Sequence, residues 1–245
     1  MGKAIKTSFE RYEKKYFLTP DQYRLFKERL APYVKADEYP TYTLCNIYYD
    51  TDDYRLIRAS LEKPIYKEKL RVRSYGVPGA DSNVFVELKK KCDGVVYKRR
   101  ITTTPFNAQC LLNGFRTQAQ NNQISNEIAY FRQFYHATPK VFIAYDREAY
   151  QGIENSDLRI TFDTNLRYRL ENLSLQSGDY GEPIIDSGSI LMEIKIPGVC
   201  PLWLSRLLSE FKIYPTSFSK YGECYKRHIL AGNKTIFTKE ALLSA

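Results

Sequence analysis

Apolar and polar residues alternate along several stretches of the chain, a pattern typical of half-buried β-strands. It predicts eight strands, over residues 8–18, 41–50, 66–75, 83–91, 95–103, 140–150, 157–164 and 189–196. Asp93-Gly94 lies between the fourth and the fifth of these. Because Asp-Gly is the strongest short signal for a hairpin, we expect those two strands to pair antiparallel.

Helices are expected in the gaps between the strands. Thr19 would cap a helix over 19–34, with Pro20 in its first turn and Gln22 completing a capping box. Further helices are expected from Thr104-Pro105 to Gly114 and over 125–136, 201–212 and 217–230. Antiparallel hairpins mixed with helices indicate the α+β class, and eight strands can close around one small ligand. We therefore expect a single domain over residues 1–245, an eight-stranded antiparallel β-barrel with flanking helices.

Charged residues recur two apart inside these strands, which places them on one face of each strand. Arg71 and Arg73 follow this pattern, with apolar Leu70 before Arg71 and apolar Val72 between the two arginines. The same spacing is found in Glu87 and Lys89, Lys98 and Arg100, Tyr145 and Arg147, Arg159, Thr161 and Asp163, and Glu193 and Lys195. Each strand could simply present a polar face to water, as half-buried antiparallel strands do. If helices cover the apolar face instead, the charges line the inside of the barrel.

Cations that line a narrow lumen indicate an anionic ligand. Two like charges 4 Å apart repel by roughly 4 kcal/mol at an effective dielectric near 20, so the arrangement favours a bound polyanion. Arginine forks fit phosphate oxygens, and phosphate-bound Mg²⁺ or Mn²⁺ typically takes one or two carboxylates. Glu193 is the first choice for that metal ligand. Glu87 and Glu13 are expected to form salt bridges that hold neighbouring Lys and Arg in place.

Composition agrees with an anionic partner. The 245 residues include 37 Lys and Arg against 28 Asp and Glu, a formal net charge of +9. That excess does not separate nucleic acid, membrane headgroups and phosphorylated small molecules. No secretory leader and no run of 18 apolar residues is found, so we expect a soluble, cytoplasmic protein without direct membrane insertion. The five cysteines are scattered without a C-x-x-C pair, which argues against a structural zinc site.

Short motifs follow one another along nearly the whole chain: Phe9-Glu10-Arg11-Tyr12-Glu13-Lys14-Lys15-Tyr16, Leu70-Arg71-Val72-Arg73, Val86-Glu87-Leu88-Lys89, Tyr97-Lys98-Arg99-Arg100, Tyr145-Asp146-Arg147, Leu158-Arg159-Ile160, Met192-Glu193-Ile194-Lys195 and Phe218-Ser219-Lys220-Tyr221. In this order and spacing they resemble the polyphosphate polymerase (VTC) domain. That family is one of the triphosphate tunnel metalloenzymes, which also include the CYTH proteins.

The resemblance implies an eight-stranded tunnel that binds a triphosphate. Its phosphate-binding residues would be Lys15, Arg71, Arg73, Lys89, Lys98, Arg100, Arg147 and Lys220, with hydroxyl groups from Tyr145 and Ser219 and a Mn²⁺ or Mg²⁺ ion on Glu193. Arg159 and Lys195 share the predicted charged face and join this phosphate-binding set. The catalytic residues would be Arg71, Arg73, Lys89, Arg147 and Glu193.

Two positions depart from the family patterns. Arg11 stands where the CYTH E-x-E-x-K pattern has its first Glu, which favours the polymerase branch. Ser217 stands where polymerases of this family can carry a Lys, so the last helix is expected to bind phosphate less firmly.

The expected activity is transfer of the ATP γ-phosphate to a growing polyphosphate chain. Such an acceptor is already ionised near neutral pH and needs no general base, which agrees with a chain whose only histidines, His136 and His228, lie outside the strand motifs. One alternative is a triphosphatase that hydrolyses tripolyphosphate or nucleoside triphosphates. A second is a non-catalytic module that binds polyanions. Nucleic acid is not the expected partner, because the basic residues alternate with apolar ones in covered strands.

Overall fold

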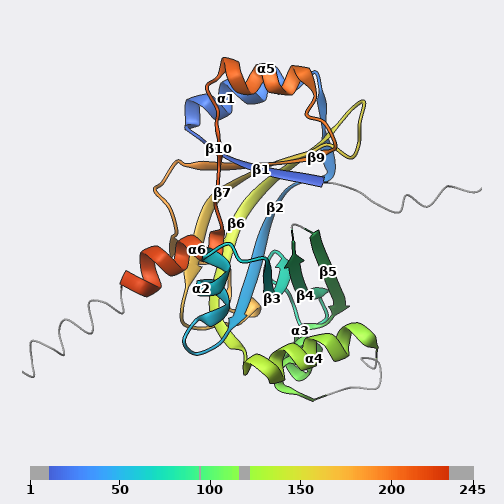
Figure 1. The fold of residues 1–245 in the computed structure, drawn as a ribbon, viewed down its shortest axis with the longest axis vertical. Coiled ribbons are helices and arrows are strands. Elements are labelled where there is room, and N and C mark those ends of the chain that lie inside the picture. The colour runs from blue at the N-terminus through green and yellow to red at the C-terminus, as the bar shows by residue number, and fades with distance from the viewer. Residues whose placement is uncertain (1–10, 94, 116–121, 232–245) are drawn as a thin grey trace, which may run out of the picture. The chain divides into compact units, whose positions relative to one another are not determined.

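The computed structural model describes residues 11–93, 95–115 and 122–231 (Figure 1). The contacts of the chain divide it into two compact units. Unit 1 comprises the described residues of Met1–Tyr42, Asp146–Asn165 and Ile185–Phe218, and unit 2 those of Thr43–Tyr145, Leu166–Ile184 and Ser219–Ala245. Three strands, β2, β6 and β7, contribute residues to both units. A single domain over 1–245 stays a prediction.

The strands are β1 (Arg11–Leu18), β2 (Val34–Asp50), β3 (Tyr66–Tyr75), β4 (Val84–Cys92), β5 (Val95–Thr103), β6 (Thr138–Gly152), β7 (Arg159–Arg169), β8 (Glu182–Pro183), β9 (Ile190–Pro197) and β10 (Pro215–Thr216). The α-helices are α1 (Pro20–Leu30), α2 (Arg55–Leu61), α3 (Pro105–Asn113), α4 (Gln123–Tyr135), α5 (Leu202–Glu210) and α6 (Lys220–Cys224). A 3₁₀ turn covers Leu175–Ser177, and a π-helical turn over Tyr225–Ile229 continues α6.

All eight expected strands are present, within a few residues at most ends. The largest difference is that β2 begins at Val34, where the sequence analysis still places a helix. Residues 8–10 of the first expected strand and Gly94 of the hairpin lie outside the described residues. The predicted pairing of β4 with β5 is confirmed, with Cys92 opposite Val95 across the turn.

In unit 1 the hydrogen-bonded order of strands is β10-β1-β9-β7-β6. The pairs β1–β10, β1–β9 and β7–β9 are antiparallel. Helices α1 and α5 lie side by side over one face of these strands (Figure 1), and Phe26 of α1 packs edge-to-face on Phe211 after α5. Alternate strand residues such as Met192 and Ile194 are buried in this core together with Leu204 of α5.

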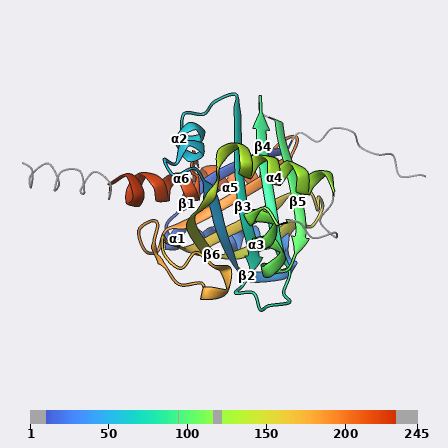
Figure 2. The ribbon, with the colours of Figure 1, turned by 90° about the horizontal axis from the view of Figure 1, so that it is seen from below.

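In unit 2 the order is β6-β2-β3-β4-β5, and β8 pairs with β7. Helices α3 and α4 lie over β3, β4 and β5 (Figure 2). Val72 of β3 and Val86 of β4 are buried against Leu111 of α3 and Ile128 of α4. Each unit therefore has its own core, built from the apolar face of the strands and the helices that cover it.

The α+β class, with an antiparallel sheet and flanking helices, is confirmed. Among the described residues the sheet has ten strands, and β10 and β5 stand at its two ends without pairing to each other. The sheet is therefore not the closed eight-stranded barrel that was expected. The additional strands, β8 and β10, are two residues long, too short for a periodic signal. Lys98 and Arg99 place charges on both faces of β5, which is typical of an edge strand that resists further pairing.

Hydropathy adds one further observation. Within the described ranges, none of the helices combines the length and the apolar character needed to cross a bilayer.

Candidate functional site

The charged residues of β3, β4 and β5 lie on the face of these strands opposite the core of unit 2. Leu70, Val72, Val86 and Leu88 are buried in that core. Because successive side chains of a strand point to opposite faces, the residues between them face away from α3 and α4. This face carries Lys69, Arg71, Arg73, Glu87, Lys89, Lys98 and Arg100, which we call the unit 2 cluster.

Glu87 lies among the cations of the unit 2 cluster and is only 1% exposed. Its carboxylate accepts a hydrogen bond of 2.8 Å from Arg71 Nε and another of 2.8 Å from Arg100 Nε. Lys98 Nζ lies 2.8 Å from the same carboxylate, and Arg73 Nε lies 4.0 Å away. Burial alone would raise the pKa of Glu87, but the charges of Arg71, Arg73 and Lys98 outweigh it and hold this pKa far below its usual value. Glu87 is therefore a charged anchor for these cations at neutral pH.

Residues of β2 orient the two arginines of β3. Tyr48 lies opposite Arg71 in the register and accepts a hydrogen bond of 3.2 Å from Arg71 Nη1. Asn46 lies opposite Arg73 and accepts a bond of 2.8 Å from Arg73 Nε. Burial would raise the pKa of Tyr48, but the charges of Arg71 and Arg73 lower it to about 8. Both guanidinium groups are thus held in fixed orientations.

The start of α6 adds further polar groups to unit 2. Lys220 Nζ lies 4.3 Å from the centre of the Tyr145 ring, a cation–π contact, and Tyr145 Oη accepts a hydrogen bond of 3.3 Å from Arg73. Ser219 caps α6, since its Oγ accepts a bond of 3.2 Å from the amide of Gly222. The same Oγ lies 3.3 Å from Lys69 Nζ. Tyr145, Ser219 and Lys220 therefore adjoin the unit 2 cluster.

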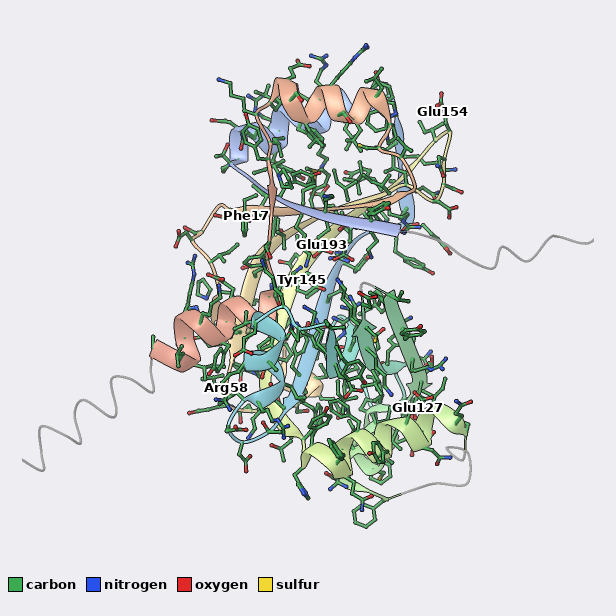
Figure 3. The ribbon with its side chains drawn as sticks, in the orientation of Figure 1. Phe17, Arg58, Glu127, Tyr145, Glu154 and Glu193 are labelled. Atoms are coloured by element: carbon green, nitrogen blue, oxygen red, sulfur yellow. The ribbon has the colours of Figure 1, made fainter. Side chains whose placement is uncertain are left out.

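A second group of charges, which we call the unit 1 cluster, consists of Lys15, Arg147, Asp163 and Glu193. Arg147 binds Asp163 through both arms of its fork, at 2.6 Å from Nε and 2.7 Å from Nη2. Arg147 Nη2 also donates to Glu193 at 3.2 Å, and Lys15 Nζ lies 3.7 Å from the other oxygen of Glu193. Figure 3 shows Glu193 on the side of β9 away from α1 and α5. Glu193 is therefore a buried carboxylate between two cations.

The neighbouring row of unit 1 is more exposed. Lys195 lies opposite Glu13 on one side and Arg159 on the other. Arg159 forms an ion pair with Asp37, and Glu13 lies 3.6 Å from Lys15. The ion pairs expected for Glu87 and Glu13 are thus both present.

The two clusters contain or adjoin most residues that the sequence analysis selects. Lys89 is placed on the expected face but is exposed, and within the described residues it has no ion pair. Asn46, Tyr48 and Lys69 were not predicted as site residues, although Asn46 and Tyr48 are two residues apart in the sequence and Lys69 is two residues before Arg71. Asp163 was predicted on the charged face, but its pairing with Arg147 was not, because that contact depends on the pairing of β6 with β7.

A metal held only by protein side chains does not fit the described residues, since no group of three or more His, Cys, Asp or Glu side chains converges among them. A divalent ion that arrives with phosphates needs only one or two protein carboxylates. Glu193 fits that lesser requirement, because it is a buried carboxylate on the charged face of β9.

Comparison with known proteins identifies the family and relates the fold to solved structures. The model of the VTC domain family matches residues 10–229. No curated protein is similar enough in sequence to match the chain. A candidate adenylate cyclase from Bacillus halodurans has the same fold, with a TM-score of 0.51 at 13% sequence identity over 84% of this chain and 92% of that chain. A candidate adenylyl cyclase from Hippeastrum with a dominant triphosphatase activity has a TM-score of 0.49 at 16% identity over 86% of this chain and 93% of that chain.

Proposed function

Because the chain belongs to the VTC domain family, we propose that it is a polyphosphate polymerase, which transfers the γ-phosphate of ATP to the end of a polyphosphate chain. The observation that carries the proposal is the excess of cations in the unit 2 cluster. Arg71, Arg73, Lys98 and Arg100 all contact the single carboxylate of Glu87. One carboxylate cannot neutralise four cations, so the cluster favours a multiply charged anion.

Phosphates would be bound by both clusters in this proposal. The residues concerned are Arg71, Arg73, Lys89, Lys98, Arg100, Tyr145, Ser219 and Lys220 of unit 2, and Lys15, Arg147, Arg159 and Lys195 of unit 1. Asn46 and Tyr48 hold the forks of Arg73 and Arg71 in place before substrate arrives, which lowers the cost of ordering them on binding.

The reaction needs alignment and charge stabilisation more than covalent help from the protein. A terminal oxygen of the polyphosphate chain forms the new bond to the γ-phosphorus. The bond from that phosphorus to the bridging oxygen of ADP breaks, and ADP leaves with the electron pair. Because the attacking oxygen is already ionised, no proton has to be removed. Arg71 and Arg73 would stabilise charge on the phosphates bound by unit 2, and Arg147 would do the same for phosphates bound by unit 1.

Glu193 would provide the protein carboxylate for a Mn²⁺ or Mg²⁺ ion that the phosphates also bind. When bound, such an ion neutralises charge on phosphate oxygens. Lys15 and Arg147, which contact Glu193 in the structure, would then share the carboxylate with that ion or turn toward phosphate.

Incubation of the purified full chain with ATP and Mn²⁺ tests the proposal directly. ADP and long phosphate chains should accumulate together, resolved on a gel and by chromatography. Free phosphate without chains would contradict polymerisation and support a triphosphatase instead. Binding of polyphosphate without consumption of ATP would support a non-catalytic polyanion-binding module.

Substitution of Glu193 tests the metal assignment. Glu193→Ala should lower the rate of chain synthesis by about 100-fold, the usual effect of removing one group that stabilises transition-state charge. The control is Glu154→Ala, which removes an exposed carboxylate of unit 1 outside the unit 1 cluster and should change the rate by less than about threefold. A Glu193→Ala protein that makes polyphosphate at the wild-type rate in the presence of metal would rule out this role.

A further inference from the structure

A pocket of about 300 Å³ in unit 2 is lined by residues from the C-terminal ends of α3 and α4, the end of β2 and the start of β6. We call it the helix-end pocket. Small-molecule sites range from about 300 to 1,000 Å³, so this pocket is large enough for a molecule of one or two rings and too small for a polymer.

The helix-end pocket and the unit 2 cluster lie on opposite faces of the same strands. Tyr49 lines the pocket and packs against the core that α3 and α4 cover (Figure 2). Tyr48, the residue before it in β2, contacts Arg71 on the other face. A ligand in the helix-end pocket would therefore be separate from the phosphates of the proposed reaction.

Apolar groups form one part of the pocket wall. They are the ring of Tyr49 and the side chains of Leu112, Ala137 and Pro139. Leu112 and Ala137 are buried members of the unit 2 core, so this part of the wall is held in place by packing. Such a surface suits a flat apolar group.

Arg132 of α4 brings a positive charge to the pocket. Its guanidinium lies against Gly114, where a Cβ atom would stand only 3.0 Å from Nη1. Among the described residues Arg132 forms no ion pair, and no Asp or Glu lines the pocket. Asp52 bonds to Thr138, which does line it, but the carboxylate of Asp52 is already paired with Lys140 at 2.7 Å. The pocket therefore has an uncompensated cation.

A structural role for Arg132 has to be weighed against this reading. The residue lies in the last turn of α4, where a positive charge stabilises the helix carbonyls. That role accounts for the charge by itself, and it makes no statement about the other polar groups of the pocket.

The hydroxyl of Tyr49 is an independent observation that points to a ligand. Burial raises the pKa of this phenol to about 12, and no neighbouring charge or hydrogen bond contributes to the shift. Within the part of the chain that the structure describes, the hydroxyl has no hydrogen-bond partner. A buried hydroxyl without a partner is costly, and an acceptor bound in the pocket would relieve that cost.

We propose that the helix-end pocket binds a small organic anion, with a ring against Tyr49 and Leu112 and a single carboxylate or phosphate group on Arg132. An acceptor of the ligand would bind the hydroxyl of Tyr49. Asn113, Gln133 and His136 add hydrogen-bonding side chains to the wall. The pocket is a second ligand site, and its occupation does not depend on the proposed phosphate transfer.

Benzoate and phenyl phosphate are suitable probes, because each carries one ring and one of the two anionic groups. Binding to the full-length protein is measured by ligand-observed NMR with excess tripolyphosphate present to compete for the two charged clusters. At least one probe should bind with a Kd of about 1 mM or lower, and the tighter of the two identifies the anionic group. Benzamide, which has the shape of benzoate without its charge, should bind at least about tenfold more weakly.

Three results of this experiment would overturn the proposal. They are no binding of either anionic probe, equal binding of benzamide and benzoate, and displacement of the probes by tripolyphosphate. The last result would show that the probes bind the charged clusters instead.

Arg132→Gln tests the cation of the pocket. The variant should bind the better probe about tenfold more weakly, as expected for the loss of a charged hydrogen-bond donor. The matched control is Arg58→Gln, which removes the same charge from an exposed position of α2 in unit 2 and should change the affinity by less than about twofold. Equal losses in the two variants would contradict the proposed site. Arg132→Lys keeps the charge without the fork and carries the same comparison if Arg132→Gln does not fold.

Tyr49→Phe tests the hydroxyl without removing the ring. The affinity for the better probe should fall by about fivefold, because one hydrogen bond to the ligand is lost. The Tm should not fall, since the hydroxyl has no described partner within the protein. A lower Tm with unchanged affinity would show that the hydroxyl is structural, and unchanged affinity at any Tm would reject its role in binding.

Discussion

Glu87 compensates four neighbouring cations from an almost fully buried position, so its charge should matter for stability as well as for binding. Glu87→Gln keeps the shape of the side chain but removes the charge. We expect the free energy of unfolding at pH 7 to fall by about 3 kcal/mol, because the cations are left uncompensated. Urea denaturation measures this directly.

At acid pH the free energies of unfolding of the wild type and Glu87→Gln should become more similar. The pKa of Glu87 is held below its unfolded value of about 4.3, so its stabilising contribution is complete above that pH. The contribution is lost as the pH falls toward the lower folded-state pKa. A difference in the free energy of unfolding that does not change with pH would contradict this account. Because the cations are left uncompensated in Glu87→Gln, tripolyphosphate should stabilise the variant more than the wild type.

Tyr48 gives the unit 2 cluster a dependence on alkaline pH. Its phenol has a pKa of about 8 beside Arg71 and Arg73, so a phenolate forms as the pH rises above that value. The other groups that face it are Lys69, which also favours the phenolate, and the ring of Tyr221, stacked at 5.0 Å between centroids. A negative charge next to Arg71 should weaken phosphate binding.

The matched measurement compares tripolyphosphate affinity in wild type and Tyr48→Phe between pH 7 and pH 9. The wild type should lose several-fold in affinity across this range, since one unit of pKa corresponds to tenfold. Tyr48→Phe should lose much less. Identical pH profiles would contradict the role of this phenol, and phenolate absorbance reports its titration independently.

Individual site residues could be predicted from the sequence where the alternation of side chains along a strand was enough to assign them to a face. Arg71, Arg73 and Glu87 could be assigned to one face by counting alone, and the expected salt-bridge role of Glu87 agrees with its contacts. The bidentate pair of Arg147 and Asp163 could not, because it joins residues of β6 and β7 whose register depends on contacts far apart in sequence.

At the scale of elements, Asp50 joins the end of β2 to two helices. Its carboxylate accepts hydrogen bonds from the amides of Leu56 and Ile57 at the start of α2, at 2.9 and 3.0 Å. It also accepts a bond of 2.9 Å from Tyr221 Oη of α6. The first turn of α2 and the segment that carries Lys220 are thus held by one buried side chain.

Asp50→Ala should therefore destabilise unit 2 by about 3 kcal/mol, since several buried donors lose a charged acceptor. Tyr221→Phe removes only the bond to α6 and should cost about 1 kcal/mol. Both values can be measured by chemical denaturation. Equal losses in the two variants would show that the bonds to α2 contribute nothing.

Local chemistry explains which helices could be predicted. The capping box of α1 is present as expected, with Gln22 and Thr19 each bound to the other's backbone amide. Helix α2 was missed because its N-cap, Tyr54, has a left-handed backbone with no side-chain cap, and Asp50 caps the helix from outside its usual position. No spacing rule between neighbouring residues would reveal that arrangement.

At the scale of the whole molecule, the net charge of +9 and the proposed phosphate sites predict that an anionic ligand stabilises the fold. Tripolyphosphate at 100 times its dissociation constant should raise the free energy of unfolding by about 2.7 kcal/mol. Thermal denaturation with and without ligand checks this, and added salt should reduce the shift. Sulfate at equal ionic strength is the control, and an equal shift with sulfate would contradict specific binding.

The class of the fold and the existence of its main strands could be predicted from periodicity, but the closure of the sheet could not. Strand number in the sheet depends on two-residue segments, Glu182–Pro183 and Pro215–Thr216, that acquire strand geometry only by pairing with β7 and β1. Such pairing is a property of the folded chain and leaves no local pattern.

The regular register of β3, β4 and β5 constrains how this part of the gene can change in length. An insertion of a single codon in β4 before Leu88 would turn every later side chain of that strand to the opposite face. Lys89 would then point into the hydrophobic core and Leu88 would point out of it. Codons added in pairs would preserve the alternation. Variation in the length of this strand should therefore be tolerated in even steps only.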